Sequence, residues 1–152
     1  MKPVSFTALI LFVLVAVLPV SSSANPMNTV TIDTRSGSHG WMVELASDDA
    51  SRSKGLMFRK SMAPKSGMLF RFETTRAVAM WMKNTFIPLD MIFADNSGKV
   101  THIHRGAVPH SLDVISSRVP ARFVLEVNAG EADRHGITTG DRLRHPWILP
   151  VN

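Results

Sequence analysis

The sequence contains no cysteine, so disulfide bonds, a lipid-modified N-terminal cysteine and thiol catalysis are all excluded. It also lacks a Gly-x-Ser-x-Gly nucleophile motif and a glycine-rich phosphate-binding loop. No internal repeat or low-complexity tract follows Ala24. The folded state must therefore be stabilised by an apolar core. The sequence has enough apolar residues to form one, since 45% of the residues are hydrophobic.

Acidic residues are scarce: 12 Asp and Glu stand against 17 Lys and Arg, a formal net charge of +5. One stretch concentrates the positive charge, with Glu73 as its only acidic residue, and such a patch attracts anions. We expect an anionic small molecule, an acidic glycan, another envelope component or an acidic protein as partner, and no nucleic acid. The basic residues of this stretch are Arg52, Lys54, Arg59, Lys60, Lys65, Arg71, Arg76 and Lys83.

The sequence has one long apolar run, Phe6–Val20, which follows Lys2 and precedes small residues that end at Ala24. This order predicts a cleavable signal peptide over residues 1–24, with Ser22 and Ala24 suited to recognition by the signal peptidase. The run is shorter than the ~20 residues that a spanning helix needs, so no permanent membrane anchor is expected. The protein is therefore predicted to be exported, to the periplasm or, alternatively, into the medium.

The remaining chain predicts a flexible leader over residues 25–28 and a single β-rich domain over residues 29–152. Ser47 is expected to cap a short helix that ends near Gly55, and Leu56–Phe58 to enter the core. The fold class predicted is mainly β with minor α, a compact antiparallel barrel or sandwich with one or two short helices. Strands are expected at 29–34, 41–46, 68–72, 77–82, 89–94, 99–105, 122–127 and 141–147, a hairpin turn at 95–98, a loop at 106–120 and a helix or turn at 129–136.

The segment Trp81–Asp90, WMKNTFIPLD, is the most informative for function. Pro88 and the small polar residues before it are typical of a rigid connection between two strands. Alternatively, the segment forms the floor of a pocket on which Lys83, Asn84 and Asp90 converge. Residue chemistry alone leaves both interpretations open.

Four motifs in fixed order resemble the bacterial and archaeal family known as domain of unknown function 192. They are GLMFR at 55–59, GMLF at 67–70, WMKNTFIPLD at 81–90 and LEVNAG at 125–130. The resemblance covers nearly the whole chain after the signal peptide. It implies a small β-barrel-like domain with a short helix, and it implies no established reaction, cofactor or substrate. The recurring polar positions map to Arg59, Lys83, Asn84, Thr85, Asp90 and Glu126.

These polar residues, with the neighbouring Trp81, are the predicted ligand-binding set. Their opposite charges could pair in an internal network that fixes the fold, since buried charges are tolerated when paired. In the other interpretation, Arg59 and Lys83 bind a carboxylate or phosphate in a polar pocket. The residues do not decide between a network and a pocket.

Three further groups of residues have a chemistry of their own. Asp90 and Glu126 could serve as the acid and base of a glycoside hydrolase, which needs two carboxyls ~5–10 Å apart. His102 and His104 lie two apart on a predicted strand, and His110 could add a third metal ligand; no cofactor is predicted, because alternation also marks the wet face of a strand. Trp41, Trp81 and Trp147 could stack on sugars, although tryptophan more commonly packs in a core.

The leading hypothesis is a non-catalytic, exported binding or accessory module for an anionic ligand. The alternatives are an enzyme acting on envelope carbohydrate through Asp90 and Glu126, and a structural interaction protein that has an exposed apolar patch and no pocket.

Overall fold

The computed structural model describes residues 28–148. The predicted signal peptide and residues 25–27 of the predicted leader lie outside this range, as do residues 149–152. Within residues 28–148, no helix is long and apolar enough to cross a membrane.

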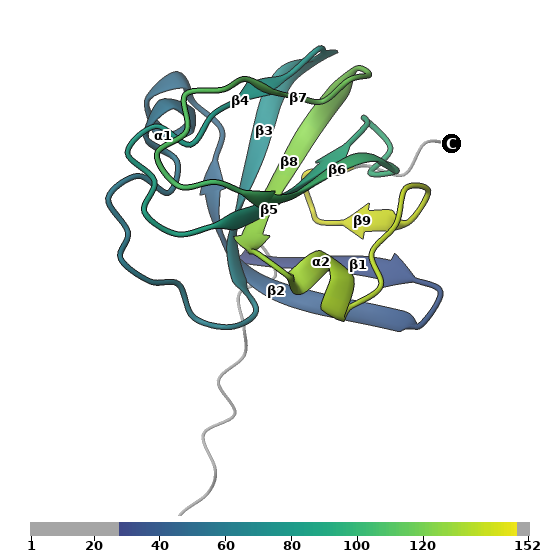
Figure 1. The fold of residues 1–152 in the computed structure, drawn as a ribbon. Coiled ribbons are helices and arrows are strands. Elements are labelled where there is room, and N and C mark those ends of the chain that lie inside the picture. The colour runs from purple at the N-terminus through teal and green to yellow at the C-terminus, as the bar shows by residue number, and fades with distance from the viewer. Residues whose placement is uncertain (1–27, 149–152) are drawn as a thin grey trace, which may run out of the picture.

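A curled seven-stranded sheet forms the body of the domain (Figure 1), with the strand order β6-β5-β8-β3-β2-β1-β9. A second sheet pairs β4 with β7. Two short helices complete the fold of residues 28–148. The strands are β1 Thr29–Thr34, β2 Gly37–Ala46, β3 Ser66–Arg76, β4 Ala79–Met80, β5 Leu89–Ala94, β6 Val100–Ala107, β7 Ile115–Ser116, β8 Ala121–Asn128 and β9 Arg142–Arg144, and the helices are α1 Asp49–Lys54 and α2 Glu131–Arg134.

The curled sheet is partly closed by contacts between its two ends. Strand β9 pairs with β1, and Leu143 N donates to Gly98 O over 2.8 Å at the β5–β6 turn. Lys99 and Arg142 form an antiparallel bridge at the same place. The predicted class, mainly β with minor α, is confirmed. One strand pair, β2–β3, runs parallel, because α1 and the loop after it carry the chain back to its starting end.

Alternation along the strands divides the apolar residues between two cores. On β8, Phe123, Leu125 and Val127 enter a core that α2 covers with Ala132. Val124 of the same strand enters a second core together with Leu56, which follows α1. Because successive strand residues point to opposite faces, Glu126 lies on the side of Val124 and the second core.

The structure shortens two predicted strands. The predicted strand 77–82 is reduced to β4, because β7 offers only two residues for pairing and the chain turns where Thr85 N donates to Met82 O. The predicted strand 141–147 is reduced to β9. The predicted loop 106–120 contains the end of β6 and the whole of β7.

The first helix begins one residue later than predicted. Asp48, not Ser47, is its N-cap, because the Asp48 carboxylate accepts from Ser51 N over 2.9 Å while Ser51 Oγ accepts from Asp48 N. The triplet Leu56–Phe58, which follows the helix, does not enter the core as a whole. Leu56 is buried as expected, whereas Phe58 is 61% exposed. Phe58 adopts a left-handed backbone conformation, which turns the chain outward.

The Asp90 carboxylate joins three segments of backbone. Its Oδ1 accepts from Gly106 N, at the end of β6, over 2.9 Å. Its Oδ2 accepts from Gly130 N and Ala132 N, at the start of α2, each over 2.9 Å. Gly130 has a φ of 87°, a conformation that glycine adopts without steric cost. Asp90 therefore fixes where β6 ends and where α2 begins.

We predict that Asp90→Asn destabilises the domain by about 3 kcal/mol, because an amide keeps one acceptor oxygen and turns its NH₂ toward backbone N–H donors. Urea unfolding of residues 28–148 measures this. Asp113→Asn, in an exposed loop, is the matched control and should cost less than about 1 kcal/mol. Equal midpoints for the two variants would contradict the assigned role.

Candidate functional site

A cavity of about 270 Å³ lies between α1, β3, the segment from β4 to Thr85, and β8. Its walls combine apolar side chains with a cationic rim. The apolar members are Leu56, Met57, Phe70, Phe72, Met80 and Trp81, and the polar and charged members are Asp49, Arg52, Ser53, Lys54, Arg76, Lys83, Thr85 and Glu126.

Glu126 is the buried carboxyl of this cavity. In the sheet it is paired with Met68 of β3 on one side and with Met91 of β5 on the other, and both methionines belong to the second core. The residue is 4% exposed. Among residues 28–148, its carboxyl has no hydrogen-bond or ion-pair partner. Burial raises the pKa of Glu126 to about 8, so the carboxyl is largely protonated at pH 7.

Close packing of the backbone fixes Glu126 in place. Gly67 of β3 pairs with Val127, and a Cβ on Gly67 would come within 2.3 Å of the Glu126 carbonyl oxygen. Any larger residue at position 67 would force β3 and β8 apart. The GMLF motif therefore supports the position of the carboxyl through sheet geometry.

The rim carries four cations, which differ in how they are engaged. Arg52 donates to Ser47 O and Arg71 O and pairs with Asp49 at 2.5 Å, so its guanidinium already has partners within the protein. The Arg76 guanidinium lies 5.1 Å from the Phe72 ring centroid, and the Lys83 ammonium lies 5.2 Å from the Trp81 ring. Within the described part of the chain, neither Arg76 nor Lys83 pairs with a carboxylate.

Four of the seven predicted ligand-binding residues line this cavity, namely Trp81, Lys83, Thr85 and Glu126. The other three lie elsewhere. Arg59 forms a two-pronged ion pair with Glu44, both distances being 2.6 Å, and its guanidinium lowers the pKa of Glu44. Asn84 has a φ of 54° and accepts Phe58 N at its carbonyl.

Asp90 and Glu126 do not form a pair of catalytic carboxyls. In the β5–β8 register Asp90 faces Val127 and Met91 faces Glu126, so the two carboxyls point to opposite faces of the sheet. The glycosidase arrangement considered from the sequence is therefore absent. The single internal network of Arg, Lys, Asp and Glu is absent too, because Arg59 and Asp90 have separate partners and Lys83 lies at the cavity.

Two of the three candidate metal ligands, His102 and His110, pack on different aromatic rings. His102 stacks on Phe93 with ring centroids 5.7 Å apart, and His110 packs on Phe86 at 5.1 Å. Burial, followed by nearby positive charge, lowers the pKa of His102. Across residues 28–148, no cluster of three or more His, Asp or Glu side chains is arranged to hold a metal ion.

The tryptophans occupy three different environments. Trp41 is fully buried in the first core. The ring of Trp147 lies 4.5 Å from the Arg71 guanidinium. Trp81 is half-exposed at the cavity and is the one of the three that a ligand could contact there.

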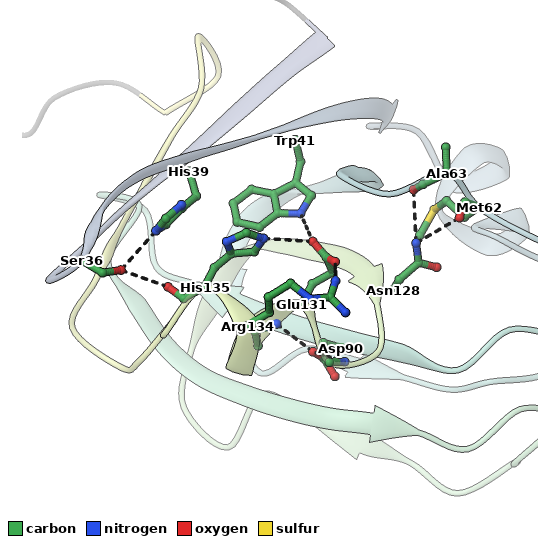
Figure 2. A network of polar contacts seen from close by, with 12 residues as sticks. Ser36, His39, Trp41, Met62, Ala63, Asp90, Asn128, Glu131, Arg134 and His135 are labelled. Carbon is green, nitrogen blue, oxygen red and sulfur yellow. Dashed lines mark hydrogen bonds and ion pairs between the residues drawn. The ribbon is translucent and has the colours of Figure 1, made fainter.

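A second buried carboxyl, Glu131 of α2, provides a comparison. Figure 2 shows it between Trp41, His135 and Arg134. Its Oε2 accepts Trp41 Nε1 over 3.2 Å and lies 3.3 Å from His135 Nε2, while Oε1 pairs with Arg134. Burial lowers the pKa of His135, although Glu131 opposes that shift. Both carboxyl oxygens of Glu131 therefore have partners. The buried carboxyl of Glu126, which lines the cavity, has none among residues 28–148.

The sequence indicated the charge of the site but not its members. Arg52, Lys54 and Arg76 belong to the basic stretch noted above, yet Arg59, Lys60, Lys65 and Arg71 of the same stretch do not line the cavity. The apolar walls Phe70 and Phe72 gave no functional signal, because alternating aromatics on a strand also predict a core.

A profile of the domain of unknown function 192 family, described as "Uncharacterized ACR", matches residues 30–145. The chain belongs to this family. The domain is similar to a protein from Sinorhizobium meliloti 1021, crystallised as a proposed transcription regulator, with 51% identity and a TM-score of 0.76; the match covers 78% of this chain and 93% of that one.

The DUF192 domain is also similar to a protein of unknown function from Novosphingobium aromaticivorans DSM 12444. That match has 39% identity and a TM-score of 0.76, and covers 85% of this chain and 91% of the other. No curated protein matches the chain. The resemblance inferred from the four motifs is thus confirmed, and the structure adds where the motif residues lie.

We predict that Glu126→Gln becomes progressively more stable than the native domain as pH rises. The pKa of Glu126 is about 8 in the folded domain and 4.5 in the unfolded chain. Between these two pH values the carboxyl is therefore protonated when the domain is folded and ionised when it is unfolded. The native stability from the protonated carboxyl is therefore complete below pH 4.5 and is lost as pH rises toward 8. The difference in unfolding free energy should change by on the order of 3 kcal/mol between about pH 5 and 8.

Urea unfolding of both proteins across this pH range measures the difference. Using the difference cancels titrations that the two proteins share. Glu73→Gln, which removes an exposed carboxyl from β3, is the matched control. A Glu126→Gln difference that stays constant with pH would show that the carboxyl is ionised in the folded domain.

Proposed function

We propose that this domain is a non-catalytic module that binds a small organic anion in the cavity between α1, β3 and β8. The observation that carries the proposal is Glu126, a buried carboxyl without a partner that faces a cavity. A buried polar group that lacks a partner is costly unless something satisfies it. A ligand that places a hydrogen-bond acceptor against the protonated carboxyl would do so.

The positive charges at the rim of the cavity favour an anionic ligand. Arg76 and Lys83 have no carboxylate partner in the described chain, and Lys54 adds a third cation, whereas the one acidic rim residue, Asp49, is paired with Arg52. Guanidinium and ammonium groups bind carboxylates and phosphates through charge-assisted hydrogen bonds. The protonated state of Glu126 matters here, because an ionised carboxylate would repel the same ligand.

The walls support a ligand with an apolar body. Phe70, Phe72 and Leu56 line the cavity together with Glu126 and the cations. The ligand we propose therefore has a charged end at Arg76 and Lys83, an apolar or aromatic middle, and an acceptor at its inner end. A cavity of about 270 Å³ is slightly smaller than most small-molecule sites, which favours a small organic anion over a glycan chain.

The geometry favours binding over the carbohydrate enzyme. A glycosidase mechanism needs a second carboxyl opposite Glu126. Asp90 faces the other side of the sheet, and the side chain of Asp49 is 99% exposed and already paired. This arrangement therefore supports anion binding over acid–base catalysis.

Nucleic-acid binding has little support in this fold, despite the description of the S. meliloti relative. Among the described residues the longer helix, α1, has six residues and faces the cavity through Arg52 and Lys54. Recognition of a DNA major groove commonly uses a longer helix.

The binding test uses benzoate and hexanoate, with benzamide and hexanamide as uncharged analogues of the same shape. Calorimetry with residues 28–148 should show saturable binding of at least one carboxylate, and binding of its amide at least about tenfold weaker. Arg76→Gln and Lys83→Gln should each weaken carboxylate binding by about fivefold to thirtyfold. Lys99→Gln, an exposed cation at the β5–β6 turn, is the matched control.

The pH dependence tests the role of Glu126 separately. Carboxylate binding to the native domain should weaken as pH rises through 8, because the ionising carboxyl repels the anion. Glu126→Gln should bind at pH 7 and lose this dependence. Equal affinity for carboxylates and amides, or no effect of the rim variants, would contradict the proposal.

Export is part of the proposal and depends on residues 1–24. In a bacterial host with a general secretion system, we expect the mature protein to begin at Asn25 and to be found in the periplasm. Mass spectrometry of the purified N-terminus and cell fractionation measure this. A full-length chain retained in the cytoplasm would contradict export.

A further inference from the structure

The geometry points to a second functional surface beside the cavity: we infer that it docks the domain onto an anionic lipid bilayer. The surface, here called the apolar loop surface, consists of Phe58, Trp81, Phe86, Val108, Leu112 and Val114. These are six of the eight exposed large hydrophobic side chains in the described chain, and their exposure ranges from 39% to 71%. The inference does not depend on the proposed ligand.

Backbone hydrogen bonds hold the three contributing segments together. Phe58 N donates to Asn84 O over 2.8 Å. His110 N donates to Thr85 O, and Met82 N to Ser111 O, each over 3.1 Å. The segment after α1, the segment before β5 and the loop after β6 therefore lie side by side, although they are far apart in the sequence.

Two aromatic members of this surface, Phe58 and Phe86, contact each other. The rings of Phe58 and Phe86 meet edge to face, with their centroids 6.1 Å apart. The His110 ring also packs on Phe86, with the centroids 5.1 Å apart. Aromatic packing of this kind fixes the rings relative to one another while leaving them open to solvent. Phe58, Phe86 and His110 thus form a preformed cluster of rings, and the other exposed apolar residues lie on the same three neighbouring segments.

Backbone strain is concentrated in the same place. Phe58, Asn84 and His110 have φ values of 65°, 54° and 64°, and they are three of the five non-glycine residues with positive φ in residues 28–148. Such conformations cost free energy and are retained where the surrounding structure or a function requires them. Here they turn Phe58 out of the core and bring the loop of residues 108–114 against Phe86.

The charges around this surface favour a lipid surface as its partner. Lys83 lies between Trp81 and Phe86 in the sequence, and Lys60 follows Phe58 by two positions. Asp113 is the one carboxylate among residues 56–60, 81–87 and 108–114. Aromatic rings beside lysines suit a bilayer interface, where the rings lie at the acyl boundary and the ammonium groups among phosphates.

A second copy of the chain is less well matched to this surface. The net charge of +5 makes two copies repel, whereas an anionic bilayer attracts the same charge. The predicted export route also brings the domain to a membrane. An acidic protein would satisfy the charge but would have to match apolar side chains that stand on three separate loops.

The test is flotation of residues 28–148 with vesicles of phosphatidylcholine alone or in an equimolar mixture with phosphatidylglycerol. This part of the chain folds without a longer segment, since the matching domain makes up 93% of the crystallised S. meliloti chain. It also omits the apolar run at 6–20, which would bind vesicles by itself. We expect binding to the anionic vesicles at least about tenfold stronger than to the neutral ones, weakened by salt.

The double variant Leu112→Ser and Val114→Ser should reduce this binding by about tenfold or more, because both side chains leave the acyl boundary. Neither residue lines the cavity, so benzoate binding should stay unchanged, which separates this test from the ligand proposal. Met42→Ser removes an exposed apolar side chain of β2 and is the matched control. Lys83→Gln should weaken vesicle binding by about fivefold.

Three results would overturn the inference. One is native protein that does not float with anionic vesicles. Another is an equal loss of binding in the Met42→Ser control. The third is a concentration-dependent dimer, seen by analytical ultracentrifugation, that the double variant abolishes, because the surface would then belong to a second copy.

Discussion

The arrangement of this domain depends on the Asp90 carboxylate and its three backbone N–H donors. These bonds join the end of β6 to the start of α2 and hold both against β5. A carboxylate that accepts several backbone hydrogen bonds can remain buried without a cationic partner. Because α2 covers one core, the same bonds help to close the curled sheet at that end (Figure 1).

The two buried glutamates show how similar side chains acquire different roles. Glu131 is surrounded by donors from Trp41, Arg134 and His135 (Figure 2), so its position is explained by the contacts it makes. Glu126 lies between methionines and faces a cavity. The desolvation that raises its pKa is a cost that the fold carries without an internal partner. This asymmetry is why we place the ligand site at Glu126 and a structural role at Glu131.

The cavity and the apolar loop surface adjoin each other through Trp81. Its ring lines the cavity, contacts Lys83 and is half-exposed on the loop surface. We expect an amphiphilic anion to bind well here, because the Lys83 ammonium, the apolar cavity wall and the exposed ring of Trp81 are neighbours. Both proposals concern one layer of loops and short strands, which contributes Val78, Met82 and Ile87 to the second core.

The class of the fold, the family and the excess of cations near the site could all be predicted from the sequence, as could the β5–β6 hairpin at the Asp95–Gly98 turn. These follow from local rules, because alternation, turn residues and motif spacing are properties of neighbouring positions. Which polar residues meet depends on the packing of the whole domain. Asp90 and Glu126 look equivalent along the chain, yet the strand register sends one carboxyl to backbone donors and the other to a cavity. Likewise, Arg59 and Arg76 share one basic stretch, and the distance of each from Glu44 depends on how distant strands pack. Register and packing are fixed by contacts between residues far apart in sequence, so no local pattern could have separated the structural members of the motifs from those that line the site.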